Sequence, residues 1–101
     1  MKKEESLEIL KQALLITQDM QDKAHTESWE DIIPLERQRQ RLLDTVFPIE
    51  QADDRLREIL EMIVKLNNTI EHQCREAKGE LQKQLTDMNK NKRAMSAYLI
   101  P

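Results

Sequence analysis

Hardly any residue of this chain is able to stop a helix, and this restricts the available folds more than any other feature of the sequence. The chain holds one glycine, Gly79, and three prolines, Pro34, Pro48 and Pro101. A sandwich or barrel of strands needs turn signals at about every 8–12 residues, which this sequence lacks. Strong helix formers such as Leu, Glu, Gln, Lys, Arg and Met are abundant instead. We therefore expect an all-α protein.

The first two helices are predicted from apolar residues that recur at helical spacing. One helix is expected over about 4–24, ending in the polar segment KAHTES. A second is expected over about 28–46, with Ser28 as its N-cap, Asp31 as a short capping-box acid and Pro48 as its end. Pro34 inside this segment either kinks the helix or begins its main body. Of the two, we favour a short first turn followed by a bend.

The third helix is expected to be long, from about 50 to 97, with Gly79 as the one point at which it could break. At 1.5 Å per residue it would span roughly 70 Å, against roughly 30 Å for each of the first two helices. We thus expect a single domain over 1–101, an antiparallel bundle or hairpin of three to four helices. The stripe of the third helix comprises Leu56, Leu60 (or Ile59), Ile63, Leu66, Ile70, Cys74, Ala77 and Leu81, then Leu85, Met88 and Met95 after a one-residue slip.

The distal part of this long helix, from about 77 to 100, has an apolar stripe that two shorter helices do not cover. Three outcomes are open. The segment bends back near Gly79, it pairs with a second copy, or it meets a different protein. Each outcome gives the protein a partly apolar surface.

Composition excludes several classes of protein. The formal net charge is -3, with acidic and basic residues intermixed, so there is no broad phosphate-binding field. No apolar run approaches the ~20 residues of a membrane span. The start of the sequence, basic and then acidic, is not typical of a secretory signal. Cys74 is the one cysteine, which favours a reducing cytoplasm.

No constellation of residues points to catalysis, a metal or a cofactor. His25 and His72 fall in different predicted helices, and Cys74 lies about 160° around the helix from His72. Arg37 and Arg41 share a face, and three cations cluster in NKNKR near the C-terminus, but these features are weaker than those of direct DNA-binding proteins. Cations in a last helical turn also complement the helix dipole. We expect neither an enzyme nor a direct nucleic-acid binder.

The segment SWEDIIPLERQRQRLLDTVFP carries a more particular pattern. It resembles the helix W-D/E-x-L/I-x-x-L/I-E-x-x-R-x-x-L-L of the FliT family of bacterial flagellar export chaperones. The C-terminal LTDMNKNKRAMSAYL is similar to the closing segment of that family. The matching positions are Trp29, Glu30, Ile32, Leu35, Glu36, Arg39, Leu42 and Leu43 in the first segment, and Lys92, Arg93, Ala97 and Tyr98 in the second.

The resemblance implies a small helical protein that binds the C-terminal part of the filament cap protein, FliD, and passes it to the type III export apparatus. It also implies that the export ATPase complex and the flagellar master regulator FlhDC are partners and that the protein forms a homodimer. Binding to FlhDC would lower flagellar gene expression. Two features depart from the pattern. Pro34 lies inside the motif helix, and the sequence ends at Pro101, so a longer C-terminal helix of relatives is expected to be absent or shortened.

Two sets of residues are candidates for function. Apolar residues on the second helix form a predicted client surface, in which a helix of the client fills positions between two helices. The apolar C-terminal segment forms a predicted lid that competes with the client. A structural coiled coil that assembles through the distal third helix is the alternative, and a transcriptional anti-activator is a second one. The client-surface residues are Leu35, Leu42, Leu43 and Phe47, and the lid residues are Met95, Tyr98, Leu99 and Ile100.

Overall fold

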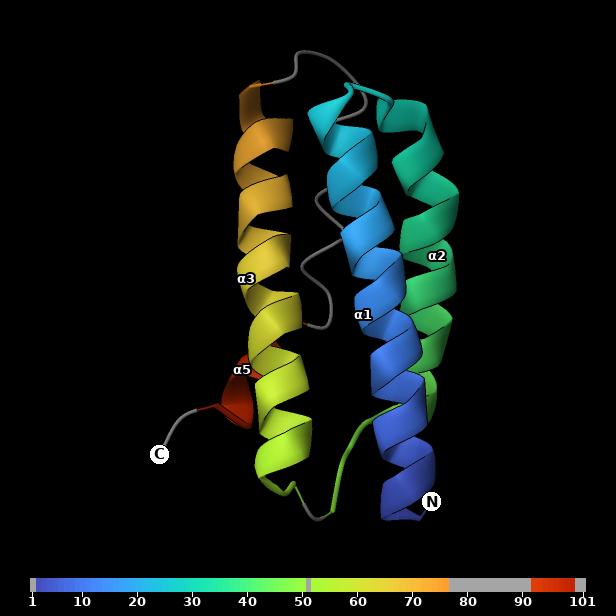
Figure 1. Ribbon diagram of the computed structural model, residues 1–101, viewed down its shortest axis with the longest axis vertical. Coiled ribbons are helices and arrows are strands. Elements are labelled where there is room, and N and C mark those ends of the chain that lie inside the picture. Colours follow the sequence, from blue (N-terminus) through green and yellow to red (C-terminus); the bar gives the residue numbers. More distant parts are fainter. Residues whose placement is uncertain (1, 51, 77–91, 100–101) are drawn as a thin grey trace.

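The computed structural model describes residues 2–50, 52–76 and 92–99, and the helices in this part of the chain lie side by side as a bundle (Figure 1). Three are long: α1 (Lys3–His25), α2 (Trp29–Val46) and α3 (Asp54–Glu76). The fourth, α5 (Lys92–Ala97), is short. The described residues contain no strand. The all-α prediction is therefore confirmed.

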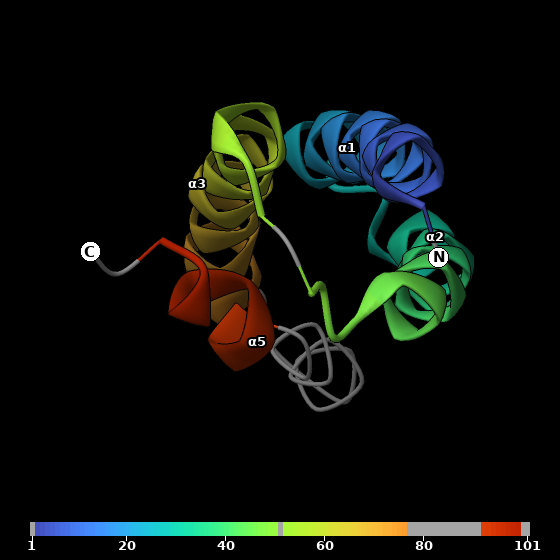
Figure 2. The same ribbon diagram turned by 90° about the horizontal axis from the view of Figure 1, so that it is seen from below.

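Helix α1 packs against both α2 and α3, and α5 packs against α3 (Figures 1 and 2). The chain runs up α1, down α2 and up α3, so α1 and α3 are parallel. Ion pairs join the lower ends of these two parallel helices. Lys3 Nζ lies 3.5 Å from Asp53 Oδ2, and Arg55 Nη2 lies 3.6 Å from Glu4 Oε1. The first pair is partly exposed and the second largely exposed, so both contribute little to stability.

Apart from Leu7, the buried residues of the three long helices alternate at spacings of four and three, which is the heptad pattern of coiled coils. Each series also contains polar or charged side chains: Ser6 and Thr17 in α1, Glu36 and Arg39 in α2, and Asn67 in α3. In α3 the position between Ile63 and Ile70 belongs to Asn67, whereas Leu66, the predicted stripe residue, is half-buried. The series are Ser6, Leu10, Ala13, Thr17, Met20 and Ala24 in α1; Ile32, Glu36, Arg39, Leu43 and Val46 in α2; and Leu56, Leu60, Ile63, Asn67, Ile70 and Cys74 in α3.

Apolar side chains at these positions form two clusters, one in each half of the bundle. The lower cluster comprises Leu7, Leu10, Ala13, Leu43, Val46, Leu56, Leu60, Ile63 and Met95. The upper cluster comprises Met20, Ala24, Ile32, Ile70 and Cys74. Burial of these side chains is the main source of stability, at roughly 1.5–3 kcal/mol for each large one before entropy is subtracted.

A central polar layer, defined here as Thr17, Glu36, Arg39 and Asn67, lies between the two clusters in the heptad series. The Arg39 side chain is almost fully buried, with 1% of its residue exposed. Its Nη2 donates to Glu36 Oε2 at 2.7 Å, and its Nη1 donates to Thr17 Oγ1 at 3.2 Å. Thr17 in turn donates to the carbonyl of Ala13. The guanidinium therefore joins α1 to α2 in the middle of the bundle.

The predicted start of α2 needs correction in two details, whereas its predicted end at about residue 46 agrees with the structure. Ser28 occupies the N-cap position, but its hydroxyl makes no capping bond and lies 3.1 Å from Thr26 Oγ1 instead. Pro34 lies inside one continuous helix, so the helix body does not begin there. As the sixth residue of α2, Pro34 removes only one backbone hydrogen bond close to the helix start, where the first four N–H groups have no helical partner in any case.

The start of the third helix also differs from the prediction. Helix α3 begins at Asp54 and not at about residue 50, because Asp53 caps it. The Asp53 carboxylate accepts a hydrogen bond from the backbone N–H of Leu56 at 3.0 Å. This bond, and then the neighbouring Arg55, lowers the pKa of Asp53. A capping carboxylate satisfies an N–H group that would otherwise lack a partner.

The third helix is expected from about 50 to 97 with a possible break at Gly79, and the described residues do not fit a straight rod over that range. Such a rod would be roughly 70 Å long, whereas the longest extent of the molecule is 40 Å. The hydroxyl of Tyr98 lies 2.7 Å from the backbone nitrogen of Ile49, at the opposite end of the predicted rod. The described residues on either side of 77–91 thus lie beside each other, which is the first of the three expected outcomes. Gly79, the predicted break, lies outside the described residues.

The buried ion pair leads to a first prediction. Glu36→Leu should destabilise the fold by about 3 kcal/mol, because it removes the carboxylate that compensates the buried Arg39 charge. The double variant Glu36→Leu/Arg39→Met removes that charge as well and should recover most of the loss. Denaturant titrations give the free energies of unfolding.

Glu61→Ala is the matched control, since Glu61 pairs with Lys65 at 3.1 Å on the exposed face of α3. It should change the free energy of unfolding by less than about 0.5 kcal/mol. A double variant as unstable as Glu36→Leu alone would show that the buried charge is not the cause of the loss.

Candidate functional site

The predicted client-surface residues on α2 divide into one core residue and its half-buried neighbours. Leu43 is 2% exposed and belongs to the lower cluster. Leu42 precedes it and points about 100° away around the helix, and it is half-buried. Leu35, seven residues before Leu42, is also half-buried and packs against the edge of the upper cluster. Leu35 and Leu42 therefore flank the core on one line along α2.

The fourth predicted residue, Phe47, lies just after α2 and contacts the C-terminal segment. Its ring stacks on Tyr98, with ring centroids 5.7 Å apart and planes inclined by 11°. Stacked aromatic pairs of this kind contribute about 0.5–1.5 kcal/mol beyond burial. The backbone N–H of Ile49 donates to the Tyr98 hydroxyl at 2.7 Å. Two contacts thus hold Tyr98 at the corner between α2 and α3.

The remaining lid residues differ in depth. Met95 is fully buried and belongs to the lower cluster, together with Leu43. Leu99, like Tyr98, is partly buried against that cluster. Ile100 lies outside the described residues. The structure thus brings Leu43 and Phe47 together with the C-terminal segment, whereas Leu35 lies apart from it near the upper cluster.

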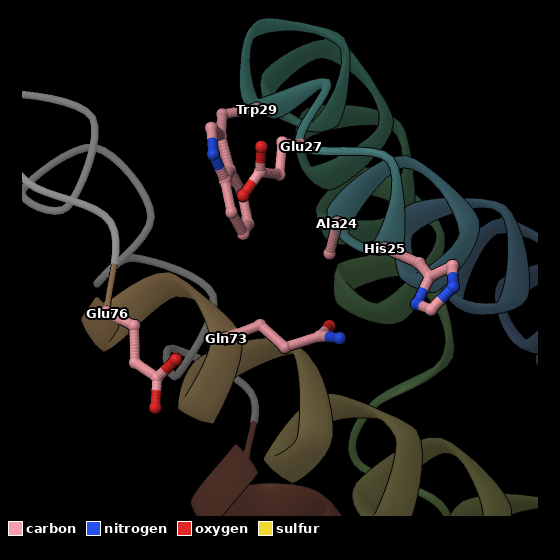
Figure 3. A pocket seen from close by; sticks show the side chains of 6 residues that line it. All are labelled: Ala24, His25, Glu27, Trp29, Gln73 and Glu76. Atoms are coloured by element: carbon pink, nitrogen blue, oxygen red, sulfur yellow. The ribbon is translucent and has the colours of Figure 1, made fainter.

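The upper end of the bundle contains a hollow that sequence analysis did not predict (Figure 3). It has a volume of about 330 Å³ and is lined by Ala24, His25, Glu27, Trp29, Gln73 and Glu76. Trp29 is partly buried and packs against the upper cluster, so it holds the start of α2 on the bundle. In Figure 3 the Trp29 indole points from the start of α2 toward Gln73 of α3. The hollow therefore lies where the α1–α2 turn meets the end of α3.

The turn above this hollow has an unusual backbone. Glu27 adopts a φ of 60°, in the left-handed region. It follows the end of α1, and the next residue, Ser28, donates its N–H to the carbonyl of Lys23 at 2.7 Å. Glycine is the usual residue at this position because it has no Cβ. The chain thus places a glutamate side chain beside Trp29 at a position that disfavours it.

Metal binding, membrane crossing and the state of the one cysteine can each be judged from the described residues. Within them no group of three His, Cys, Asp or Glu side chains is arranged to hold a metal ion. Among the described helices, none combines the length and the apolar character needed to cross a bilayer. Burial, and then the charge of Glu71, raises the pKa of the Cys74 thiol to about 11. This thiol is a core side chain of the upper cluster.

Sequence reasoning missed the two charged members of the central polar layer. Glu36 and Arg39 are named in the sequence analysis only as positions of the family motif, and the neighbouring Arg37 and Arg41 are exposed. The signal that identifies both is their place in the heptad series between Ile32 and Leu43. A charged pair at two consecutive core positions, three residues apart, can form an ion pair inside the bundle.

Comparison with known families gives one match. The family model described as flagellar protein FliT matches residues 7–99. This range includes α1 from Leu7 onward, all of α2 and α3, and the C-terminal segment as far as Leu99. No curated protein matches the chain, and no solved structure matches it either. The family match is therefore the comparison on which function is argued.

The raised pKa of Cys74 leads to a second prediction. Because its pKa is about 11 in the fold against an ordinary 9.0, the thiolate fraction at pH 8 should be roughly a hundredfold lower in the native protein than in the unfolded chain. A chromogenic disulfide reagent should react correspondingly slowly until urea unfolds the protein. The neutral thiol favours the fold below about pH 9, and this contribution is lost as the pH rises toward 11. Equal rates in the native and unfolded protein would contradict the burial of the thiol.

Proposed function

The chain belongs to the FliT family of flagellar proteins, and on this premise we propose that it is a cytoplasmic chaperone of type III flagellar export whose client is the C-terminal region of the filament cap protein FliD. The family supports a flagellar role of the chaperone type in general. The choice of FliD as client comes from the resemblance of the α2 motif and the closing segment. The observation that carries the proposal is the family match over 7–99.

The proposed mechanism is recognition of an amphipathic client helix by the α2 face of the bundle. The client would cover Leu35 and Leu42, which are half-buried and share one line along the helix. Phe47, also half-buried, continues that surface at the lower corner. Leu43 supports the surface from inside, because it is part of the lower cluster. Covering partly exposed leucines costs the chaperone no rearrangement of its core.

In this proposal the C-terminal segment competes with the client at the lower corner. It is docked there by the Phe47–Tyr98 stack and by the hydrogen bond from Ile49 to the Tyr98 hydroxyl. A client that needs Phe47 must displace this segment, and it can do so only through its higher affinity for the open form. The buried Met95 would remain the anchor of the segment.

The further partners of the proposal are the export ATPase complex, the FlhDC regulator and a second copy of the chain. They rest on family resemblance alone. The alternative is a coiled coil that self-assembles through the distal third helix, and it stays a prediction because most of that segment, 77–91, lies outside the described residues. The heptad positions of α1, α2 and α3 are buried within one chain, so those positions offer no apolar stripe to a second copy.

The third prediction separates the contact surface from the core. A peptide from the C-terminal region of FliD should bind with a Kd in about the micromolar range, or ~-8 kcal/mol. Leu42→Ala should weaken this binding while changing stability little, because Leu42 flanks the core. Leu43→Ala should lower the free energy of unfolding by about 2–5 kcal/mol, as is typical for a core leucine. Titration calorimetry and denaturant unfolding measure the two effects.

The control for this pair is Thr45→Ala, on the exposed side of α2. It should leave the affinity unchanged. If Leu42→Ala and Thr45→Ala bind the peptide equally well, the α2 face is not the client surface. If the unmodified protein gives neither heat nor a shift in melting temperature with the peptide, FliD is not the client.

The fourth prediction concerns the docked C-terminal segment. Tyr98→Phe keeps the ring that stacks on Phe47 but removes the hydroxyl that accepts the hydrogen bond from Ile49. Loss of that bond should weaken docking by about 1 kcal/mol. Client affinity should therefore rise by up to about fivefold, since 1.4 kcal/mol is a factor of ten. A lower melting temperature with unchanged client affinity would mean that the segment is only part of the core.

A further inference from the structure

The upper end of the bundle gathers acceptor groups around the single tryptophan of the chain. Trp29 lines the hollow described above and also a second one, of about 340 Å³. The second hollow is lined by Glu27, Ser28, Trp29, Glu30 and Asp31. Trp29 and Glu27 therefore each line two concave surfaces.

Four carboxylates line these two hollows, and three of them have a local interaction that stabilises their charge. Glu30 and Asp31 lie in the first turn of α2, where an acid complements the helix dipole. Glu76 lies 3.8 Å from His72, on its own helix. Glu27 has no such explanation, and no ion pair within 4 Å is found for it in the described part of the chain. Its carboxylate lies next to the Trp29 indole in Figure 3.

Gln73 adds an uncompensated acceptor to the first hollow. Its Oε1 atom is buried and accepts no hydrogen bond from the described residues. A buried carbonyl oxygen without a donor costs free energy, so a ligand that donates to it gains affinity. The side chain extends from α3 across the hollow, below Trp29 and toward Ala24 (Figure 3). No lysine or arginine of the described residues lines either hollow.

From these observations we propose that the Trp29 end of the bundle is a docking site for an arginine side chain of a partner protein. An indole face attracts a cation. A guanidinium is the cation that stacks flat on an aromatic ring and donates several hydrogen bonds in a fixed geometry. Glu27, which lines both hollows, supplies a carboxylate, and Gln73 supplies the buried acceptor. Anionic ligands such as nucleic acid or acidic lipid are disfavoured by the same charges.

This site lies beyond the proposed client surface. Trp29 and Phe47 lie at opposite ends of α2, roughly 27 Å apart by the helical rise. One partner helix docked along the bundle could reach both, but neither contact requires the other. The glutamate at the left-handed position fits this role, because a glycine there would suit the backbone better and would remove the carboxylate.

The experiment uses the full chain and follows the indole N–H signal of Trp29 by NMR, which is unambiguous because the chain holds one tryptophan. N-acetylarginine amide should shift this signal saturably, with a Kd in about the millimolar range expected for a single exposed contact. N-acetylcitrulline amide, which has the same shape without the charge, should shift it at least threefold less at equal concentration and ionic strength.

The matched variants are Glu27→Gln and Glu8→Gln, both of which remove one exposed carboxylate. Glu27→Gln should weaken the arginine response at least threefold, and Glu8→Gln, on α1 far from the hollow, should leave it unchanged. Equal responses to arginine and citrulline, or equal losses in the two variants, would overturn the proposal. A stronger response to spermidine than to the arginine amide would assign the site to a free polyamine and overturn the protein partner. The FliD peptide takes no part in this test, so its outcome is independent of the proposed function.

Discussion

The alignment of α1 and α2 depends on one buried interaction, the bond between the Arg39 guanidinium and Thr17 with Glu36 as its counter-charge. Apolar residues at heptad positions pack almost equally well when one helix slides by seven residues, so they specify register poorly. A guanidinium that is 1% exposed disfavours such a shift, because the shift would remove Thr17, its acceptor on α1, and leave only Glu36 on its own helix. The central polar layer thus selects one register for the helix pair.

Both candidate sites follow from that register. With Thr17 opposite Arg39, the last turn of α1 meets the first turn of α2, and the short connection places Glu27 beside Trp29. At the other end, the last turn of α2 meets the first half of α1 in the lower cluster. Phe47 then projects to the corner where Tyr98 docks. A polar, aromatic end and an apolar end result from a single helix pairing.

Local sequence was sufficient for the helices but not for their contacts. Spacing located α1 and α2 within a residue or so and indicated the α3 stripe, because burial of a helix face imposes that period. The spacing did not predict that Arg39 is buried, because a charged residue is ordinarily solvated. It also failed at Tyr98, whose partner Ile49 is 49 residues away. In the candidate site, the helical spacing predicted both Leu42 and Leu43 as surface residues. It could not show that Leu43 lies in the core and that Leu42 lies beside it.

The separation of Leu42 from Leu43 shows how a small bundle is able to offer apolar surface and still stay folded. A chain of this length buries only about 60–65% of its unfolded surface, so it has few side chains to spare from its core. Adjacent residues on a helix point about 100° apart, so one leucine fills the lower cluster while its neighbour remains half-exposed. A client proposed to cover Leu42 would therefore leave the packing around Leu43 intact. A surface built beside the core in this way would let a partner bind and leave without repacking the lower cluster around Leu43.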